Sequence, residues 1–260
     1  MTSHDEKIER AFAQQASSFD DPDYGFANPR LLRWILTHIP CEPGDFVLDV
    51  AGGTGQLACA YAERAALAVV ADVTPEMLAQ GKRRVDAEGR RNVVFMHTDA
   101  AKLPFLAESF DLVVSRFAVH HFEQPALPIA EMARVCRPGG HVGIVDLVTP
   151  GPTSGFRQDH LERLRDPSHV RALDADEIVA LLQATGMVVV SRTDRDQAVR
   201  IDRWLAQTNA PAEVGDAIRA ELQAELAGGA PTGMRPELRD GVLHQTQRWA
   251  VFLAQKPAEA

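Results

Sequence analysis

Short apolar segments alternate with more polar, helix-forming segments along the first 150 residues of this chain. The apolar segments are rich in Val, Leu, Ile and Phe, which is typical of buried parallel strands, and they lie at residues 46–50, 69–72, 93–96, 109–114 and 141–148. Helices are predicted between them at residues 56–66, 74–85 and 125–135. This alternation predicts βαβ units and therefore an α/β fold with a parallel sheet.

The two ends of the chain follow a looser pattern. Amphipathic helices are predicted before the first strand, at residues 4–19 and 31–39. After residue 149, helices are predicted at residues 156–164, 174–186, 201–205, 214–226 and 236–244. Two further strands are predicted at residues 187–191 and 249–253. These flanking elements predict additions around one central sheet.

Composition narrows the class of partner. The 260 residues carry a formal net charge of -9, which argues against a general grip on nucleic acid or on a membrane surface and favours a small-molecule partner. Cys41, Cys59 and Cys136 are odd in number and widely spaced, which indicates reduced thiols rather than disulfides or a metal site. The first ten residues are polar and no segment has the length of a membrane span, so we expect a cytoplasmic protein.

A glycine-rich turn follows the first strand. Gly52, Gly53 and Gly55 leave the backbone bare at the start of the next helix, where amide groups and the helix dipole attract an anion. Asp49 interrupts the preceding strand, and an acid buried there needs a partner. Asp72 ends the second strand, at the position where a ribose is held in nucleotide-binding folds. The alternatives are a ligand-free turn and an Asp72 that only caps the next helix.

Five motifs in order resemble one protein family. They are VLDVAGGTG at 47–55, ADVTPEML at 71–78, TDAAKLPF at 98–105, SFDLV at 109–113 and RPGG at 137–140. Together they are similar to the class I S-adenosylmethionine-dependent methyltransferases, particularly the small-molecule branch that includes quinone-biosynthesis enzymes. Residues 164–171 (LRDPSHVR) also look like one subgroup of uncharacterised relatives.

The resemblance implies a Rossmann-like, seven-stranded, mostly parallel sheet of order 3-2-1-4-5-7-6, with the last pair antiparallel and helices on both faces. The chain shows no convincing domain linker, so we expect a single domain over residues 1–260. Residues 1–40 would form a helical lid, residues 41–148 the cofactor-binding core, and residues 149–260 the acceptor side with the last two strands.

The same resemblance implies the cofactor, S-adenosylmethionine, with S-adenosylhomocysteine as product. Asp49 and the backbone of 51–55 would hold its amino and carboxylate ends, and Asp72 its ribose hydroxyls. Met77 would pack on the adenine, and Asp99 with Ala100 would read the adenine edge. The full implied set is Asp49, Ala51, Gly52, Gly53, Gly55, Asp72, Val73, Met77, Asp99, Ala100 and Ser115. Ala51 departs from the family, which commonly has glycine there, so a left-handed conformation would be strained.

Methyl transfer depends on placement of the reactants more than on acid–base groups. A base matters when the acceptor keeps its proton until the transition state. His120 and His121 follow the fourth strand and are the candidate catalytic residues, although the pair could simply pack and cap. The candidate lid and acceptor-pocket residues are Phe12, Phe19, Phe117, Phe156, His160, His169 and Trp204.

Two rival functions stay open. A nicotinamide-dependent oxidoreductase shares the glycine turn and the second acid, but the turn lacks the full dinucleotide spacing. The other rival binds S-adenosylmethionine without transferring its methyl group. The sequence leaves open whether the methylated atom is oxygen, nitrogen, carbon or sulfur, and whether the protein is a monomer or a homodimer.

Overall fold

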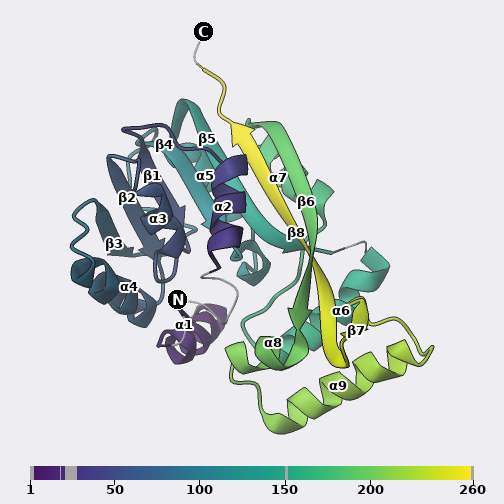
Figure 1. Cartoon of the computed structure of the whole chain (residues 1–260). Coiled ribbons are helices and arrows are strands. Elements are labelled where there is room, and N and C mark those ends of the chain that lie inside the picture. The colour runs from purple at the N-terminus through teal and green to yellow at the C-terminus, as the bar shows by residue number, and fades with distance from the viewer. Residues whose placement is uncertain (1–2, 18, 21–27, 150–151, 259–260) are drawn as a thin grey trace.

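A computed structural model describes residues 3–17, 19–20, 28–149 and 152–258, without the side chains of residues 3, 5 and 152–156. Figure 1 shows a central twisted sheet with helices on both faces and a helical group beyond one end of it. The α-helices are α1 (Ser3–Gln15), α2 (Pro29–His38), α3 (Gln56–Tyr61), α4 (Pro75–Ala87), α5 (Ala126–Val135), α6 (Pro152–Arg165), α7 (Ala175–Ala184), α8 (Ile201–Gln207) and α9 (Ala212–Leu226). Within the described ranges, every helix is too short or too polar to cross a membrane.

The strands of the sheet are β1 (Phe46–Val50), β2 (Leu67–Asp72), β3 (Val93–His97), β4 (Phe110–Arg116), β5 (Cys136–Val148), β6 (Val188–Arg200), β7 (Pro236–Arg239) and β8 (Val242–Gln255). They lie in the order β3-β2-β1-β4-β5-β8-β6, and β7 pairs with β8. β1 to β5 pair in parallel, whereas β8 is antiparallel to both β5 and β6. The predicted fold class is confirmed, and the predicted order holds along the main path, where the predicted seventh strand is β8.

The C-terminal region contains more strand than predicted. The helix predicted over residues 236–244 is wrong, because β7 and the start of β8 form a hairpin there. Asp240 and Gly241 connect these strands with φ angles of +50° and +75°, the geometry of a two-residue hairpin turn that Asp-Gly favours. β6 continues to Arg200, since an antiparallel edge strand has a solvated face and carries polar residues along it.

Two apolar layers hold the sheet between its helices. One layer packs α2, α3 and α4 against alternate residues of the central strands, such as Val47 and Val114. The other packs α5 and α7 against the residues between them, such as Leu48 and Val113. A third cluster joins α6, α8 and α9 around Trp204. The sheet is therefore covered on both faces, and its exposed carboxyl edge is left for a site.

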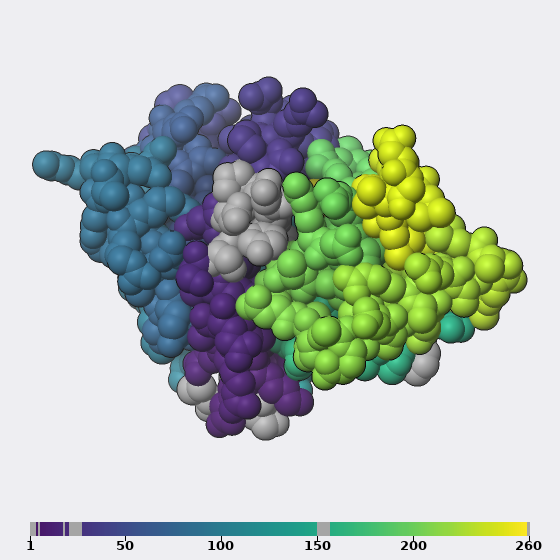
Figure 2. Space-filling model, turned by 60° about the horizontal axis from the view of Figure 1, so that its bottom comes forward, coloured from purple at the N-terminus to yellow at the C-terminus, as the bar shows by residue number. Residues whose placement is uncertain are grey.

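α1 closes over that edge. It is shorter than predicted and ends at Gln15, four residues before Phe19. Figure 2 shows α1 in the furrow between the segment around α4 and the segment around α8. α3 is likewise shorter than predicted, because its last helical residue is Tyr61 and a turn continues the chain toward β2.

Candidate active site

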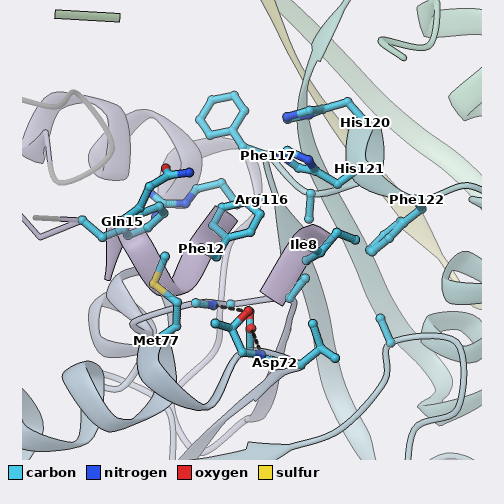
Figure 3. Close-up of a pocket in the computed structure, with 18 of the residues that line it drawn as sticks. Ile8, Phe12, Gln15, Asp72, Met77, Arg116, Phe117, His120, His121 and Phe122 are labelled. Carbon is cyan, nitrogen blue, oxygen red and sulfur yellow. Dashed lines mark hydrogen bonds between the residues drawn. The ribbon is translucent and has the colours of Figure 1, made fainter. Parts of the chain in front are cut away.

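A cavity lies at the carboxyl ends of β1, β2 and β4, where open α/β sheets bind their ligands. Its wall is built from α1, the glycine turn, the strand ends and the 3-10 helix η2 (Val119–His121), as Figure 3 shows. The predicted cofactor residues in this wall are Asp49, Ala51, Gly52, Gly53, Asp72, Val73, Met77, Asp99 and Ala100. The predicted catalytic and lid residues in it are Phe12, Phe19, Phe117, His120 and His121. We call it the first cavity.

Asp49 sits at the floor of the first cavity. Its Oδ2 accepts a hydrogen bond from the Ala58 amide at 3.1 Å, while its buried Oδ1 has no hydrogen-bond partner among the described residues. Burial raises the pKa of Asp49 to about 7, against the opposing charge of Arg116 and the hydrogen bond from Ala58. A Cβ on Gly52 would lie 2.7 Å from the Asp49 Cγ, so glycine there leaves room for this carboxyl group. The arrangement leaves one buried acceptor for a cationic donor.

Asp72 ties the end of β2 to the glycine turn. Its Oδ2 accepts from the Gly53 amide and its Oδ1 from the Thr74 amide, both at 2.8 Å. Thr74 occupies the N-cap position of α4 and its side chain makes no capping hydrogen bond, so the bond from its amide to Asp72 fixes the residue that precedes the helix. A carboxylate has about four acceptor positions, so two remain for a ligand. Asp72 can therefore hold the turn and still accept hydrogen bonds from a ligand.

The backbone of the turn has the expected strained residue. Ala51 has a φ of +53° and Gly53 one of +57°, both in the left-handed region. A non-glycine residue pays about 1 kcal/mol or more for this conformation. Gly55 has a φ of +74° but does not line the first cavity, because the space of its missing Cβ lies against Val70 and Phe95. Ser115 also lies outside the cavity wall and is fully buried in β4.

The far side of the cavity carries the residues predicted for the adenine. Met77 is buried at the first turn of α4. Asp99 is exposed, and its Oδ1 accepts from the Ala101 amide at 2.8 Å. Val73 and Ala100 complete this part of the wall. Residues that follow β2 and residues that follow β3 thus line the same cavity.

α1 closes the opposite side. Ile8, Phe12 and Gln15 project into the cavity opposite Met77 and Asp72 (Figure 3). The chain after α1 is fastened to the glycine turn, because Asp20 accepts from the Thr54 hydroxyl at 2.6 Å and pairs with Arg84 at 2.6 Å. At the other end of α1, the His4 ring contacts the backbone oxygen of His121 at 2.8 Å.

Arg116 is a wall residue that the sequence analysis missed. It ends β4, and its Nη2 donates to the Gln56 side chain at 3.2 Å. Burial lowers the pKa of Arg116, while Asp49 and Asp20 act in the opposite direction. Its place at the end of an apolar strand, three residues before η2 begins, is the signal that could have identified it. Phe122, Arg165, Asp166, Gln207 and Thr208 also line the cavity and were not predicted.

His120 is held by a buried carboxylate. Its Nδ1 lies 2.5 Å from the Asp146 Oδ1 in β5, and the Asp146 Oδ2 accepts from the Val119 amide at 2.8 Å. Burial alone would lower the pKa of His120, but the charge of Asp146 and its hydrogen bond outweigh burial and raise it above its ordinary value. Because the carboxylate accepts from Nδ1–H, the lone pair of the neutral ring is on Nε2. Asp146 was not predicted.

His121 has a different environment although it is the next residue. Its Nδ1 lies 3.0 Å from the Ser168 backbone oxygen, and its ring makes an edge contact with Phe12 at 5.1 Å between centroids. Burial, and then the charge of His120, lower the pKa of His121 well below its ordinary value. His121 is therefore neutral across the ordinary pH range.

The LRDPSHVR segment at 164–171 packs beneath this histidine pair. The amides of Val170 and Arg171 donate to the His120 backbone oxygen at 2.9 and 3.2 Å. His169, predicted for the acceptor pocket, is buried outside the first cavity wall and bonds Asp159 at 2.7 Å. Its ring lies 5.4 Å from the His120 ring, measured between centroids. The segment therefore supports the histidines through its later residues, while its Arg165 and Asp166 line the first cavity.

The remaining predicted pocket residues are scattered. Trp204 lines a second cavity next to the first. His160 is exposed on α6 and lines neither of these two cavities. The side chain of Phe156 lies outside the described residues. Within the described part of the chain, no group of three or more His, Cys, Asp or Glu side chains is placed to hold a metal ion.

Known proteins resemble this chain in both sequence and structure. The methyltransferase domain model matches residues 47–140. The uncharacterized methyltransferase YcgJ of Bacillus subtilis is 30% identical over 206 residues, which cover 79% of this chain and 81% of YcgJ. The YcgJ crystal structure matches with a TM-score of 0.79 and 26% identity, over 88% of this chain and 99% of that chain.

Two further matched proteins have names that state two different activities. A demethylmenaquinone methyltransferase of Clavibacter sepedonicus is 33% identical over 147 residues, covering 55% of this chain and 59% of that protein. The cyclase SpnF matches with a TM-score of 0.65 and 21% identity, over 88% of this chain and 81% of that chain, which shows a shared fold alone. The match to YcgJ extends over about four-fifths of both sequences, so the chain belongs to the S-adenosylmethionine-dependent methyltransferase family.

Proposed function

We propose that this protein transfers a methyl group from S-adenosylmethionine to a small organic acceptor. One observation carries the proposal: Asp49 and His120, whose ring is hydrogen-bonded to Asp146, line the same cavity. One end of that cavity suits a cationic amino group, and the other offers a base. When bound, S-adenosylmethionine supplies an electrophilic methyl group.

The residues present fit this cofactor. The unpartnered Asp49 Oδ1 would accept from its ammonium group, and the bare backbone of the glycine turn would approach its carboxylate. The two remaining acceptor positions of Asp72 would take the ribose hydroxyls. Met77, Asp99 and Ala100 would surround the adenine. Arg116, near Asp49, would keep that acid from carrying an uncompensated charge before the ligand binds.

His120 is the proposed general base. Asp146 orients its ring and raises its pKa, which makes the neutral imidazole a stronger base toward a hydroxyl, amine or activated carbon. In this role His120 would take the acceptor's proton at Nε2, and Asp146 would stabilise the resulting imidazolium. His121 has a depressed pKa and would instead shape the wall with Phe12.

A specific observation also supports α1 as a lid. The chain after α1 is fastened to the glycine turn through Asp20, so closing α1 would be coupled to the turn that holds the cofactor. Equal proteolytic cleavage near Phe19 with and without S-adenosylhomocysteine would contradict this role. Protection by the ligand is the expected result.

The first test compares ligands and then looks for transfer. Calorimetric titration with S-adenosylhomocysteine is expected to show micromolar binding, and titration with NADH none. Incubation with methyl-labelled S-adenosylmethionine and a panel of phenols, quinols, amines and thiols should then yield a labelled product. Affinity for S-adenosylhomocysteine with no labelled product on any acceptor class would favour binding without methyl transfer. NADH binding would favour the oxidoreductase.

A further inference from the structure

A second cavity of about 270 Å³ lies beside the first. It is enclosed by the start of α2, the end of β5, β6, α8 and β8, together with the residue that ends α6. Phe117, His120, Arg165 and Gln207 line both cavities, so the two meet at the proposed base. Its volume is near the lower end of about 300–1,000 Å³ for small-molecule sites, which suits a small acceptor rather than a polymer.

The wall of the second cavity carries positive charge in an acidic protein. Arg165, Arg195, Arg200 and Arg203 line it, and none of the described lining residues is acidic. The chain as a whole has a formal net charge of -9, so this local excess is against the general trend. Arg165 is neutralised by Glu162 at 3.0 Å, and Arg200 and Arg203 are exposed at the rim. The exposed Arg200 would attract an anion toward the opening.

Arg195 is the arginine inside this wall that has no carboxylate partner among the described residues. Its guanidinium stacks 4.4 Å from the Trp34 ring centroid and 5.1 Å from that of Trp249. Its Nη2 donates to the Gln197 side chain at 3.1 Å, whereas its buried Nε has no hydrogen-bond partner among the described residues. A half-buried cation with donors to spare is matched by a carboxylate, whose two oxygens fit the guanidinium fork.

The rest of the wall suits a flat, partly apolar molecule. Trp204 and Trp249 provide indole surfaces, Leu31 and Leu147 provide aliphatic ones, and Phe117 stands at the junction with the first cavity. Phe117 has a φ of +52°, a conformation that bulky residues rarely adopt and that often marks a functional position. Its ring meets that of Trp249 edge-on at 5.0 Å between centroids.

The next proposal rests on the proposed function and makes it more specific. We propose that the second cavity binds the acceptor, and that the acceptor is a small aromatic carboxylate held by Arg195. The carboxylate would pair with the guanidinium while the aromatic ring packs on Trp204 and Trp249. The nucleophilic group would then lie at the junction, near His120 and the first cavity. Arg195 is a positioning residue in this scheme and does not touch the transferred methyl group.

Tryptophan fluorescence reports on this cavity directly. The chain has three tryptophans: Trp204 and Trp249 line the cavity, and Trp34 stacks on Arg195. The test titrates the full chain, saturated with S-adenosylhomocysteine, with benzoate and with its neutral isostere benzamide. A lost hydrogen bond to a charged group is worth about 1.5–3 kcal/mol, so benzoate is expected to bind at least about tenfold more tightly than benzamide.

Three variants complete the test. Arg195→Gln is expected to reduce the benzoate preference to below about threefold, and Arg195→Lys to retain part of it. Arg192→Gln is the matched control, because Arg192 lies on the same strand and also lies over an aromatic ring, yet lines neither cavity. This variant should keep the full preference.

Two results would overturn the inference. One is equal affinity for the two probes, or no benzoate binding, in the unaltered chain. The other is a preference that survives Arg195→Gln. Calorimetry with S-adenosylhomocysteine on the same samples separates this outcome from failure of the proposed function, because Arg195 lies outside the first cavity and its replacement should leave that affinity unchanged.

Discussion

The two cavities differ in what builds them. The first is formed mainly by turns that directly follow β1, β2 and β4, and its polar contacts use backbone amides with the acids Asp49 and Asp72. The second is assembled from side chains on elements that are far apart in the sequence and is lined by arginines. A site built from local turns keeps its backbone geometry when side chains on distant elements are replaced. Under the proposed function, a cofactor site of fixed backbone geometry adjoins an acceptor site whose specificity depends on individual side chains.

A smaller contrast lies where the cavities meet. His120 and His121 are adjacent and both buried, yet the pKa of the first is raised by Asp146 and that of the second is lowered by burial and by His120. The two rings are 4.2 Å apart between centroids, so a charge on one disfavours a charge on the other. One histidine is thereby suited to accept a proton, and its neighbour to remain neutral.

The largest expected effect comes from removing the base. His120→Asn should reduce the rate of methyl transfer about 10²- to 10⁴-fold, the usual contribution of a general base, with little change in affinity for S-adenosylhomocysteine. The rate of the unaltered enzyme should rise as pH increases through the raised pKa of His120, because the neutral ring is the active form. Single-turnover rates with an acceptor from the labelled-product screen, measured from pH 5 to 9, check both points.

Two companion variants sharpen that result. Asp146→Asn removes the charge that raises the pKa of His120, so the rising limb of the pH profile should move to lower pH. His160→Asn is the control, because this exposed histidine lines neither cavity. An unchanged rate in His120→Asn would show that the acceptor reaches the reaction already deprotonated and that the histidine only packs.

The second-largest expected effect concerns Asp72, one of the two acids of the first cavity. Asp72→Ala should weaken S-adenosylhomocysteine binding by about 100-fold or more, since two hydrogen bonds to a charged group are each worth about 1.5–3 kcal/mol. Asp72→Asn keeps an acceptor oxygen and should lose less. Glu76→Gln is the matched control, because Glu76 is an exposed acid at the start of α4. Calorimetry gives all four affinities, and an Asp72→Ala affinity equal to that of the control would return Asp72 to a helix-capping role.

The sequence predicted the residues of the first cavity better than those of the second. The glycine turn, Asp49 and Asp72 were predictable because the turn follows β1, Asp49 lies within β1 and Asp72 ends β2, so that neighbours in sequence are neighbours in the site. Arg195 and Asp146 were not, because their roles depend on β6 and β5 meeting elements more than 25 residues away. The hairpin of β7 and β8 was missed although its Asp-Gly turn is a recognised signal. Long-range pairing decided the positions of Arg195 and Asp146, whereas the hairpin carried a local signal that the helix prediction overlooked.

The smallest effect concerns the protonation of Asp49. Its pKa is about 7 because burial disfavours the charged form, so at pH 6 roughly one-tenth of the chains carry the ionised acid. A ligand ammonium group binds the ionised form, and the apparent affinity for S-adenosylhomocysteine should therefore fall about tenfold between pH 8 and pH 6. The sign follows from linkage: binding at pH 6 requires Asp49 to lose its proton, so nearly one proton should be released per ligand. Calorimetry at pH 6 in two buffers of different ionisation enthalpy measures that release. Asp49→Asn, which cannot ionise, should bind more weakly and show neither the release nor the pH dependence. Equal proton release in that variant would show that another group loses the proton. It would also contradict the proposal that the Asp49 Oδ1 accepts from the ammonium group of the ligand.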